Sequence, residues 1–343
     1  MSSTEGIPFV SVIVPCFNEA DFIEDFIRRM SQQTYNNFEI IVADGLSDDG
    51  TSGLLDNLET QISNLSVVQN PARAVSFGLN AAIKSSSATI IVRMDVHTEY
   101  DIDYIAESVR LLVTHKFDCV GGSWNINIPD RTVPRGIAIS FMSYFGSGGA
   151  KSRMSDYSGP VDTVYLGAWP RESFETFGDF DESLVRNQDD ELCHRINLGG
   201  GRIYQSADIK SKYFGRTTFT KLANQFYQYG FWKPYVIFKH KAVASIRHLF
   251  PSTLVAFFVL LSLLGFYSPL FLEGAGFLFI GYIGIIFGSL QIQRRREKLL
   301  VRLVATLSVV IMHFSYGVGF LVGLYSRLIN AELMPTEKTK ISR

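Results

Sequence analysis

Residues Val92-Arg93-Met94-Asp95-Val96-His97-Thr98 join an apolar run to two polar side chains with ligand chemistry. Residues 89–92 are apolar or β-branched, which predicts a buried parallel strand that ends near Asp95. Open α/β sheets place their ligand-binding groups at the carboxyl ends of such strands. Because Asp95 and His97 alternate along the chain, an extended backbone would point both into one space, where a carboxylate and an imidazole can share a divalent cation. The alternative is a strand end with a solvated aspartate and a surface histidine.

Apolar runs and helically spaced segments alternate on both sides of this stretch. Strand, helix, strand at this spacing implies parallel pairing with right-handed crossovers. We therefore predict an α/β fold with a mostly parallel, Rossmann-like sheet. The predicted strands are 10–14, 38–42, 67–68, 89–95, 119–120 (extending no further than Trp124) and 161–166; the predicted helices are 20–30, a short one through 58, then 73–85, 102–115, 189–198 and 218–229, the last ending at Gly230.

Two further polar loops follow predicted strands, in SVIVPCFNE (residues 11–19) and IVADGLSDDGT (residues 41–51). The carboxyl ends of parallel strands meet at one edge of a sheet, so both loops should lie beside Asp95 and form a single binding cleft. Acidic residues at loop positions are the candidates for chemistry: Asp44, Asp48, Asp49, Asp95, Asp189, Asp190 and Glu191.

Several classes of chemistry lack their usual motifs. The chain contains no GxxxxGK[ST] motif of ATP hydrolysis, no GxGxxG motif of dinucleotide redox enzymes and no GxSxG motif of serine hydrolases with a nucleophile elbow. The sequence therefore gives no support to these three kinds of chemistry. Cys16, Cys119 and Cys193 form no CxxC or Cys/His ligand spacing, and we expect them to be buried free thiols in a reducing compartment.

The two halves of the chain differ in charge. Up to Gly230 there are 29 acidic and 19 basic residues, a balance of −10; from Phe231 there are 4 acidic and 13 basic residues, a balance of +9. The second half also contains three apolar runs, each about long enough to cross a hydrocarbon core of roughly 30 Å. A soluble core helix is the alternative for any single run, but three in succession favour membrane spans. The runs are 249–267, 276–292 and 303–325, with Pro269 and Glu273 marking a turn.

The charge pattern also predicts a topology. The cluster QRRREK (residues 293–298) should face the cytosol by the positive-inside bias, and the opening MSSTEGIPF shows no signal-peptide pattern. We therefore expect a multi-pass protein of the cell (inner) membrane with its N-terminal half in the cytosol. The third run would leave the C-terminus outside unless it is re-entrant. Lys338, Lys340 and Arg343 argue against an outside C-terminus, so this last span stays open.

We expect four segments. Residues 1–235 would form the catalytic domain, and residues 249–330 a membrane domain with about three transmembrane helices. Residues 236–248, in which basic and aromatic residues interleave, would be an interfacial amphipathic segment or a solvated helix face. Residues 331–343 would be a polar tail. Residues 126–158 fit no clean pattern and are either a flexible insertion or a loop that contacts the membrane or an acceptor.

Taken in order, the motifs resemble those of the family 2 inverting glycosyltransferases, which have the GT-A fold. The resemblance spans about residues 8–235. Each motif alone is weak evidence for the resemblance, but the complete set in this order is specific. The motifs are SVIVPCFNE, ADGLSDDGT, NPARAVSFGLNAAI, RMDVH in place of Asp-x-Asp, LGAWPRE and NQDDEL. Together with the apolar tail, the chain looks most like the succinoglycan-type membrane-bound glucosyltransferases of exopolysaccharide biosynthesis.

The resemblance implies a donor site. Phe17 would stack on uracil, Asp44 would hydrogen-bond the base, and Asp95 would reach the ribose and the metal-bound diphosphate. A divalent cation, Mn²⁺ or Mg²⁺, would be held by Asp95 and His97. His97 replaces the family's second aspartate, which leaves the identity of the metal open, because imidazole is a poorer ligand for Mg²⁺ than for Mn²⁺. The residues that would bind the nucleotide sugar are Pro15, Phe17, Glu19, Asp44 and Asp95.

The resemblance also implies a base and an acceptor site. A departing nucleoside diphosphate is a multiply charged anion that a cation can neutralise, and the attacking hydroxyl needs a carboxylate to take its proton. Asp189 matches that base. Asp190 and Glu191 are either functional or helix N-terminal charges, and Trp169 either stacks on a sugar or packs in the core. The implied acceptor-binding residues are Gly167, Ala168, Trp169 and Asp190.

We thus expect a hexosyltransferase that moves one sugar, glucose by resemblance, from a UDP-sugar to a polyprenyl-diphosphate-linked saccharide, in exopolysaccharide or cell-surface glycan biosynthesis. QFYQYGFWK (residues 225–233) lacks the Gln-x-x-Arg-Trp of polymerising members. The expected partners are the donor, the lipid-linked acceptor, the membrane and other polysaccharide-assembly enzymes, and no nucleic acid. Two alternatives stay open: transfer onto polyprenyl phosphate itself, and a membrane protein that binds a nucleotide sugar without turnover and uses an intramembrane His313.

Overall fold

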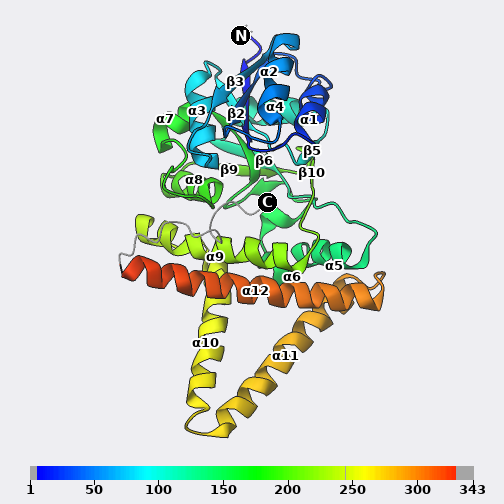
Figure 1. Cartoon of the computed structure of the whole chain (residues 1–343), viewed down its shortest axis with the longest axis vertical. Coiled ribbons are helices and arrows are strands. Elements are labelled where there is room, and N and C mark those ends of the chain that lie inside the picture. The colour runs from blue at the N-terminus through cyan, green and yellow to red at the C-terminus, as the bar shows by residue number, and fades with distance from the viewer. Residues whose placement is uncertain (1–5, 244, 330–343) are drawn as a thin grey trace. The chain divides into compact units, whose positions relative to one another are not determined.

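The computed structural model describes residues 6–243 and 245–329 (Figure 1). The chain divides into two compact units. Unit 1 is Met1–Asn125 with Met154–Phe214, and unit 2 is Ile126–Arg153 with Gly215–Arg343. This division differs from the expected boundary at residue 235, because helix α9 (Phe219–His240) runs through that point as one helix. The expected polar tail, residues 331–343, lies outside the described residues.

Unit 1 is built on a mixed, mostly parallel sheet, the α/β class that the sequence predicts. Within the described residues the sheet has eight strands in the order β3-β2-β1-β4-β8-β6-β9-β7. Strand β1 runs parallel to both β2 and β4, so the carboxyl ends of these three strands lie at one edge. The strands are β1 Val10–Cys16, β2 Phe38–Asp44, β3 Leu65–Gln69, β4 Ile90–Arg93, β6 Cys119–Gly122, β7 Gly159–Pro160, β8 Tyr165–Pro170 and β9 Ile203–Ser206.

Helices cover both faces of this sheet. Val12 and Val92 belong to the core on one face, and their sequence neighbours Ile13 and Ile91 belong to the core on the other. Because both faces are covered, the central strands read as continuous apolar runs rather than as alternating ones. The first face is covered by α1 (Ile23–Met30), α2 (Thr51–Gln61) and α4 (Tyr104–His115), and the second by α3 (Val75–Ser85), α7 (Arg171–Phe177) and α8 (Gln188–Leu198).

The chain turns earlier than expected after β4. The predicted strand ran to Asp95, but β4 ends at Arg93, and the Thr98 amide donates to the Asp95 carbonyl at 3.1 Å to close a turn. Strand β5 (Thr98–Tyr100) then pairs antiparallel with β10 (Ser211–Tyr213). Neither short strand was predicted, because three residues carry too little periodicity to be recognised and the two partners are far apart in sequence.

Residues 126–153 belong to unit 2, where they form α5 (Thr132–Phe141), α6 (Tyr144–Ser147) and the short 3₁₀ helix η1 (Lys151–Arg153). The Arg135 guanidinium donates two hydrogen bonds to Glu297, at 2.7 and 2.8 Å. Hydrogen bonding to Arg135 lowers the pKa of the Glu297 carboxyl. This pair ties α5 to the segment that carries the predicted cytosolic charge cluster.

Helices α9 and α12 (Leu299–Leu328) lie side by side in unit 2 (Figure 1). Glycines set their separation. A Cβ at Gly319 of α12 would lie 2.2 Å from the Tyr227 carbonyl oxygen, and one at Gly230 of α9 would lie 2.0 Å from that of Tyr316. Small residues at such crossings let helix backbones touch. Gly230, which was expected to end its helix, is instead a packing residue inside it.

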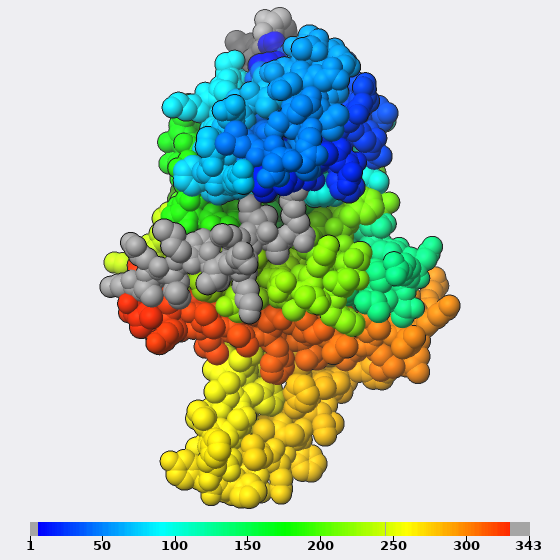
Figure 2. Space-filling model, in the orientation of Figure 1, coloured from blue at the N-terminus to red at the C-terminus, as the bar shows by residue number. Residues whose placement is uncertain are grey.

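Three of the described helices are long and apolar enough to cross a membrane: Ile246–Leu264, Pro269–Gln293 and Leu299–Leu328. Two of them, α10 (Phe250–Leu264) and α11 (Pro269–Gln293), form a hairpin that Figures 1 and 2 show in yellow and orange. In the most apolar stretch of each helix, 17% is buried in α10 and 6% in α11, whereas 50% is buried in α12. The turn lies at residues 265–268, so the prediction that Glu273 marks it is wrong; Pro269 begins α11, where the first helical turn tolerates proline.

Candidate active site

The loops that follow β1 and β2 are tied together by hydrogen bonds. The Gly45 amide donates to the Cys16 carbonyl at 2.8 Å, and the Asn18 amide donates to the Ser47 hydroxyl at 2.8 Å. The Asn18 side chain adds a bond from Nδ2 to Asp48 Oδ1 at 2.9 Å. The structure therefore brings the two predicted donor-site loops together at the carboxyl edge of the sheet.

Asp44 lies at the root of this pair of loops. It is the last residue of β2, and its side chain is almost wholly buried. Its two carboxylate oxygens accept hydrogen bonds from the hydroxyls of Ser47 and Ser52, each at 2.6 Å. Oδ2 also accepts a bond from the Ser47 amide at 3.3 Å, so the acceptor capacity that Asp44 keeps for a base is on Oδ1.

Phe17 lies over Gly45, and a cation lies over its ring. A Cβ at Gly45 would come within 3.0 Å of the Phe17 ring, so glycine is what permits this approach. The guanidinium carbon of Arg73 lies 5.0 Å from the ring centroid. Arg73 was not predicted as a site residue, because nothing in its sequence context marks a contact with Phe17. Pro15 lies in β1 opposite Ala43, half-buried.

Asp95 and His97 contact different side chains. The turn after β4 breaks the alternation on which the expectation of a shared site rested. His97 Nε2 lies 2.8 Å from Glu19 Oε2, whereas the Asp95 carboxylate meets Arg93. Glu19 is buried, and its amide donates to Thr51 Oγ1 at 2.7 Å. Glu19 therefore links the loop after β1 to the loop after β2 through Thr51, and to the turn after β4 through His97.

Arg93 was not predicted, yet it connects the two central carboxylates. Its Nε donates to Asp95 Oδ1 at 3.0 Å and its Nη2 to Asp95 Oδ2 at 3.1 Å. Burial by itself lowers the pKa of the Arg93 guanidinium, but the charges of Asp95 and Asp189 outweigh burial, so that this pKa lies above its usual value. Asp189 is therefore close enough to Arg93 for the two charges to interact.

Buried tyrosines surround Asp95. The Asp95 amide donates to Tyr100 Oη at 2.6 Å, and Tyr165 Oη lies 2.8 Å from Thr98 Oγ1. Burial raises the pKa of Tyr100, Tyr104 and Tyr165, and the negative charge of Asp95 raises each of them further. All three phenols therefore stay protonated, and the field of Asp95 reaches several hydroxyl groups.

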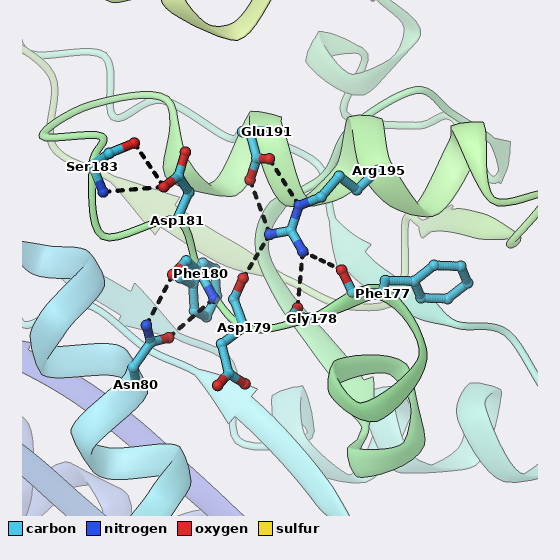
Figure 3. A network of polar contacts seen from close by, with 9 residues as sticks. All are labelled: Asn80, Phe177, Gly178, Asp179, Phe180, Asp181, Ser183, Glu191 and Arg195. Carbon is cyan, nitrogen blue, oxygen red and sulfur yellow. Dashed lines mark hydrogen bonds and ion pairs between the residues drawn. The ribbon is translucent and has the colours of Figure 1, made fainter. Parts of the chain in front are cut away.

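Helix α8 presents Asp189 in its first turn, and a buried ion pair anchors that helix. The Glu191 side chain is 0% exposed and accepts two bonds from Arg195, at 2.8 and 2.9 Å. Arg195 also donates to the carbonyls of the preceding loop, those of Phe177, Gly178 and Asp179 (Figure 3). Glu191 is thus neither a substrate ligand nor a solvated helix-end charge.

The same loop is held from its other side by α3. Asn80, the asparagine of the Gly-x-Asn motif, donates to the Phe180 carbonyl at 2.8 Å and accepts from the Phe180 amide at 3.0 Å (Figure 3). The motif that the sequence matched therefore positions the segment leading into the Asp189 helix.

Trp169 lies in the core, which corrects its expected role as a sugar-stacking residue. Its side chain is 1% exposed and its ring centroid lies 5.6 Å from that of Phe174. A Cβ at Gly167 would lie 2.4 Å from the indole, so Gly167 makes room for the ring. Ala168 is buried as well. Of the four predicted acceptor residues, only Asp190 is partly exposed.

Left-handed backbone recurs beside these residues. Non-glycine residues with positive φ lie within two positions of Phe17, Asp44, Gly167 and Asp189, at a cost of about 1 kcal/mol each. They are Asn18 (φ 54°), Leu46 (55°), Leu166 (46°) and Asn187 (65°). Strain of this kind gathers where a surrounding structure over-determines functional geometry.

The donor set fits a divalent cation only in part. Among the described residues no group of three His, Cys, Asp or Glu side chains could hold a metal unaided. Asp95 has lone pairs left after its bonds to Arg93, and Mg²⁺-type ions are commonly held by one or two carboxylates together with substrate phosphates. His97, whose Nε2 meets Glu19, does not fit beside Asp95 as arranged here.

Comparisons with known proteins agree with this arrangement. Residues 11–175 match the family described as Glycosyl transferase family 2. The succinoglycan biosynthesis protein ExoA of Rhizobium meliloti (strain 1021) is 29% identical over 269 residues, which cover 77% of this chain and 81% of that protein.

A second relative matches over more of the chain. It is the dolichyl N-acetyl-alpha-D-glucosaminyl phosphate 3-beta-D-2,3-diacetamido-2,3-dideoxy-beta-D-glucuronosyltransferase of Methanococcus voltae, 25% identical over 92% of this chain and 97% of that protein. Among solved structures, the mannosyltransferase PcManGT from Pyrobaculum calidifontis in complex with GDP-Man and Mn²⁺ has a TM-score of 0.62 at 20% identity, covering 96% of this chain and 89% of that chain. The GT-A-like fold expected from the sequence is confirmed.

Proposed function

Because this chain belongs to the family 2 glycosyltransferases, we propose that it moves a single sugar from a UDP-sugar, with inversion, to a polyprenyl-diphosphate-linked saccharide. The observation that carries the proposal is that Arg93 bonds Asp95 and interacts electrostatically with Asp189, next to the turn whose His97 meets Glu19 of the first loop. The relatives support the acceptor class, since one is a succinoglycan biosynthesis protein and another is named for a dolichyl-phosphate-linked sugar.

The chemistry follows from these positions. Asp189 takes the proton of the acceptor hydroxyl, whose oxygen attacks the anomeric carbon on the face opposite the diphosphate. The bond from that carbon to the diphosphate oxygen breaks, and the nucleoside diphosphate leaves with the electron pair. Phe17 and Asp44 hold the base, and Pro15 and Glu19 shape the loop around it. Attack from the opposite face inverts the anomeric centre.

A bound Mn²⁺ or Mg²⁺ would neutralise the charge of the leaving diphosphate. Asp95 is the residue that would share it with the diphosphate oxygens. The solved relative that contains Mn²⁺ supports a divalent cation for this fold. His97 contributes only if it leaves Glu19.

Replacing Asp189 by Asn tests the base. We expect the rate of transfer to fall by about 10²- to 10⁴-fold, the usual contribution of a general base, while binding of the nucleotide sugar is kept. Asp190→Asn is the matched control on the same helical turn, and it should raise the KM for acceptor more than it lowers kcat. Unchanged transfer by Asp189→Asn would remove Asp189 from the mechanism.

Purified protein offered a panel of UDP-sugars, with Mn²⁺ omitted and restored, tests the donor. Product formed from bare polyprenyl phosphate would favour the lipid phosphate itself as acceptor, whereas a need for a saccharide primer supports our proposal. Donor binding without product from any acceptor would favour the non-catalytic alternative.

The apolar helices support attachment to a membrane, and we propose the inner membrane with unit 1 in the cytosol. The hairpin of α10 and α11 exposes most of its apolar surface, as lipid-facing helices do. Helix α12 buries half of its apolar window against the protein, so we propose that it packs along α9 rather than crossing the bilayer as a third span.

A further inference from the structure

One donor group beside the reaction centre has no partner. Arg93 is 6% exposed, and its Nη1 atom is buried without a hydrogen-bond partner in the part of the chain that the structure describes. Its Nε and Nη2 atoms each donate one hydrogen bond to Asp95. A buried donor on a charged group is costly to leave unpaired, so such an atom calls for an explanation.

The strand geometry sets where this donor lies. Ile91 belongs to the core on the sheet face that α8 covers, and side chains two positions apart along a strand share a face. Arg93, the last residue of β4, therefore leaves the sheet on the side of the Asp189 helix. Its charge interacts with Asp189 as well as with Asp95.

Arg93 thus interacts with two groups that have different proposed tasks. Asp95 is the residue proposed to meet the diphosphate, and Asp189 the one proposed to deprotonate the acceptor. In an in-line displacement, the transferred sugar occupies the space between the leaving diphosphate and the attacking hydroxyl. A fixed N–H group in this space faces the sugar ring rather than the nucleotide.

We propose that Arg93 Nη1 donates a hydrogen bond to a hydroxyl of the transferred sugar, so that Arg93 recognises the sugar while its other two nitrogens orient Asp95. This inference rests on the proposed function, since it presumes a nucleotide-sugar donor. Arg93 is then a specificity-determining residue, because a donor sugar without an acceptor atom at that position leaves the buried N–H unpaired.

The experiment compares two ligands, UDP and UDP-glucose, by calorimetry in Mn²⁺ buffer with the full-length protein in detergent. For Arg93→Gln we expect the affinity for UDP-glucose to fall by about tenfold to a hundredfold more than the affinity for UDP, the range for a hydrogen bond to a charged group, because both ligands lose the oriented Asp95 but only UDP-glucose loses the bond to the sugar. Equal loss for both ligands would assign Nη1 to the diphosphate and overturn the proposal. No loss for either would overturn it as well.

Two further variants keep the result interpretable. Arg93→Lys retains the positive charge beside Asp95 but not the planar fork, so it should fold well and still lose the preference for UDP-glucose; full affinity in this variant overturns the proposal. Arg171→Gln is the matched control for loss of a hydrogen-bonded, partly buried arginine. All three nitrogens of Arg171 donate to backbone carbonyls of residues 83–88, so this change should lower stability and leave the ratio of the two affinities unchanged.

The wild-type protein separates this inference from the proposed function. If wild-type protein binds neither UDP nor UDP-glucose, the proposed donor class fails and the Arg93 role fails with it. If wild-type protein binds both and Arg93→Gln does not discriminate between them, only the Arg93 role fails.

Discussion

Two arginines of unit 1 form ion pairs with carboxylates and have different roles. Arg93 leaves one donor unused next to the reaction centre, whereas every nitrogen of Arg195 donates to Glu191 or to a loop carbonyl. The pattern of satisfied and unsatisfied donors thus separates an arginine that awaits a ligand from one that fixes a helix. Sequence alone shows two arginines near acidic residues and cannot make this distinction, because it depends on three-dimensional partners.

Replacing Arg195 by Ala should lower the free energy of unfolding by about 3 kcal/mol, because Glu191 would stay buried without its partner. Thermal unfolding of the purified protein measures this. Arg28→Ala is the matched control, since Arg28 pairs with Glu24 at the same i,i+4 spacing on an exposed helix and its loss should cost about 0.5 kcal/mol or less. Equal effects of the two changes would contradict the anchoring role of Arg195.

At the scale of elements, glycines decide how α9 and α12 meet. Gly319 and Gly323 of α12 are four residues apart, and a Cβ at either would run into a backbone carbonyl of α9. In the sequence both lie inside the apolar run 303–325. A pattern of small residues is compatible with a lipid-facing or a packed helix, and only the partner helix distinguishes the two.

Gly319→Ala should destabilise the packing of α9 against α12 by about 1–3 kcal/mol, because the added methyl meets the Tyr227 carbonyl rather than a movable side chain. Detergent-solubilised protein should unfold at a lower temperature. Gly284→Ala in α11 is the matched control: nothing lies within 4 Å of its Cβ, and alanine favours a helix over glycine. A melting temperature unaffected by Gly319→Ala would count against the close contact.

Much of the fold could be predicted from local pattern. The apolar runs at β1, β2 and β4 and the helices between them follow from periodicity, and the ordered motifs bring Asp44, Asp95 and Asp189 to the sheet edge. What could not be predicted depends on tertiary context. The turn between Asp95 and His97 interrupts a stretch whose sequence predicts a continuous strand. Tryptophan suits both a core and a sugar-stacking site, so the sequence alone does not decide the role of Trp169. Gly230 lies inside a helix because a neighbouring backbone needs the space.

For the whole molecule, the difference between two and three membrane crossings is testable. We expect green fluorescent protein fused after Arg343 to fluoresce, since α12 packed along α9 leaves that end in the cytosol. A fusion after Gln293 is the control, because two crossings return it to the cytosol under either arrangement. A fusion after Arg343 that does not fluoresce, together with a fluorescent fusion after Gln293, would show that the chain crosses the membrane three times.

The place of α5 in the chain has a consequence for biosynthesis. Ile139 packs with Val301 and Ala305, about 160 positions later in the sequence. At ribosomal speeds of about 5–20 residues per second, α5 emerges roughly ten seconds or more before the helix that covers it. During that interval its apolar face needs a chaperone or a lipid surface. A nascent chain stalled before residue 299 should therefore be more prone to aggregation than the finished protein.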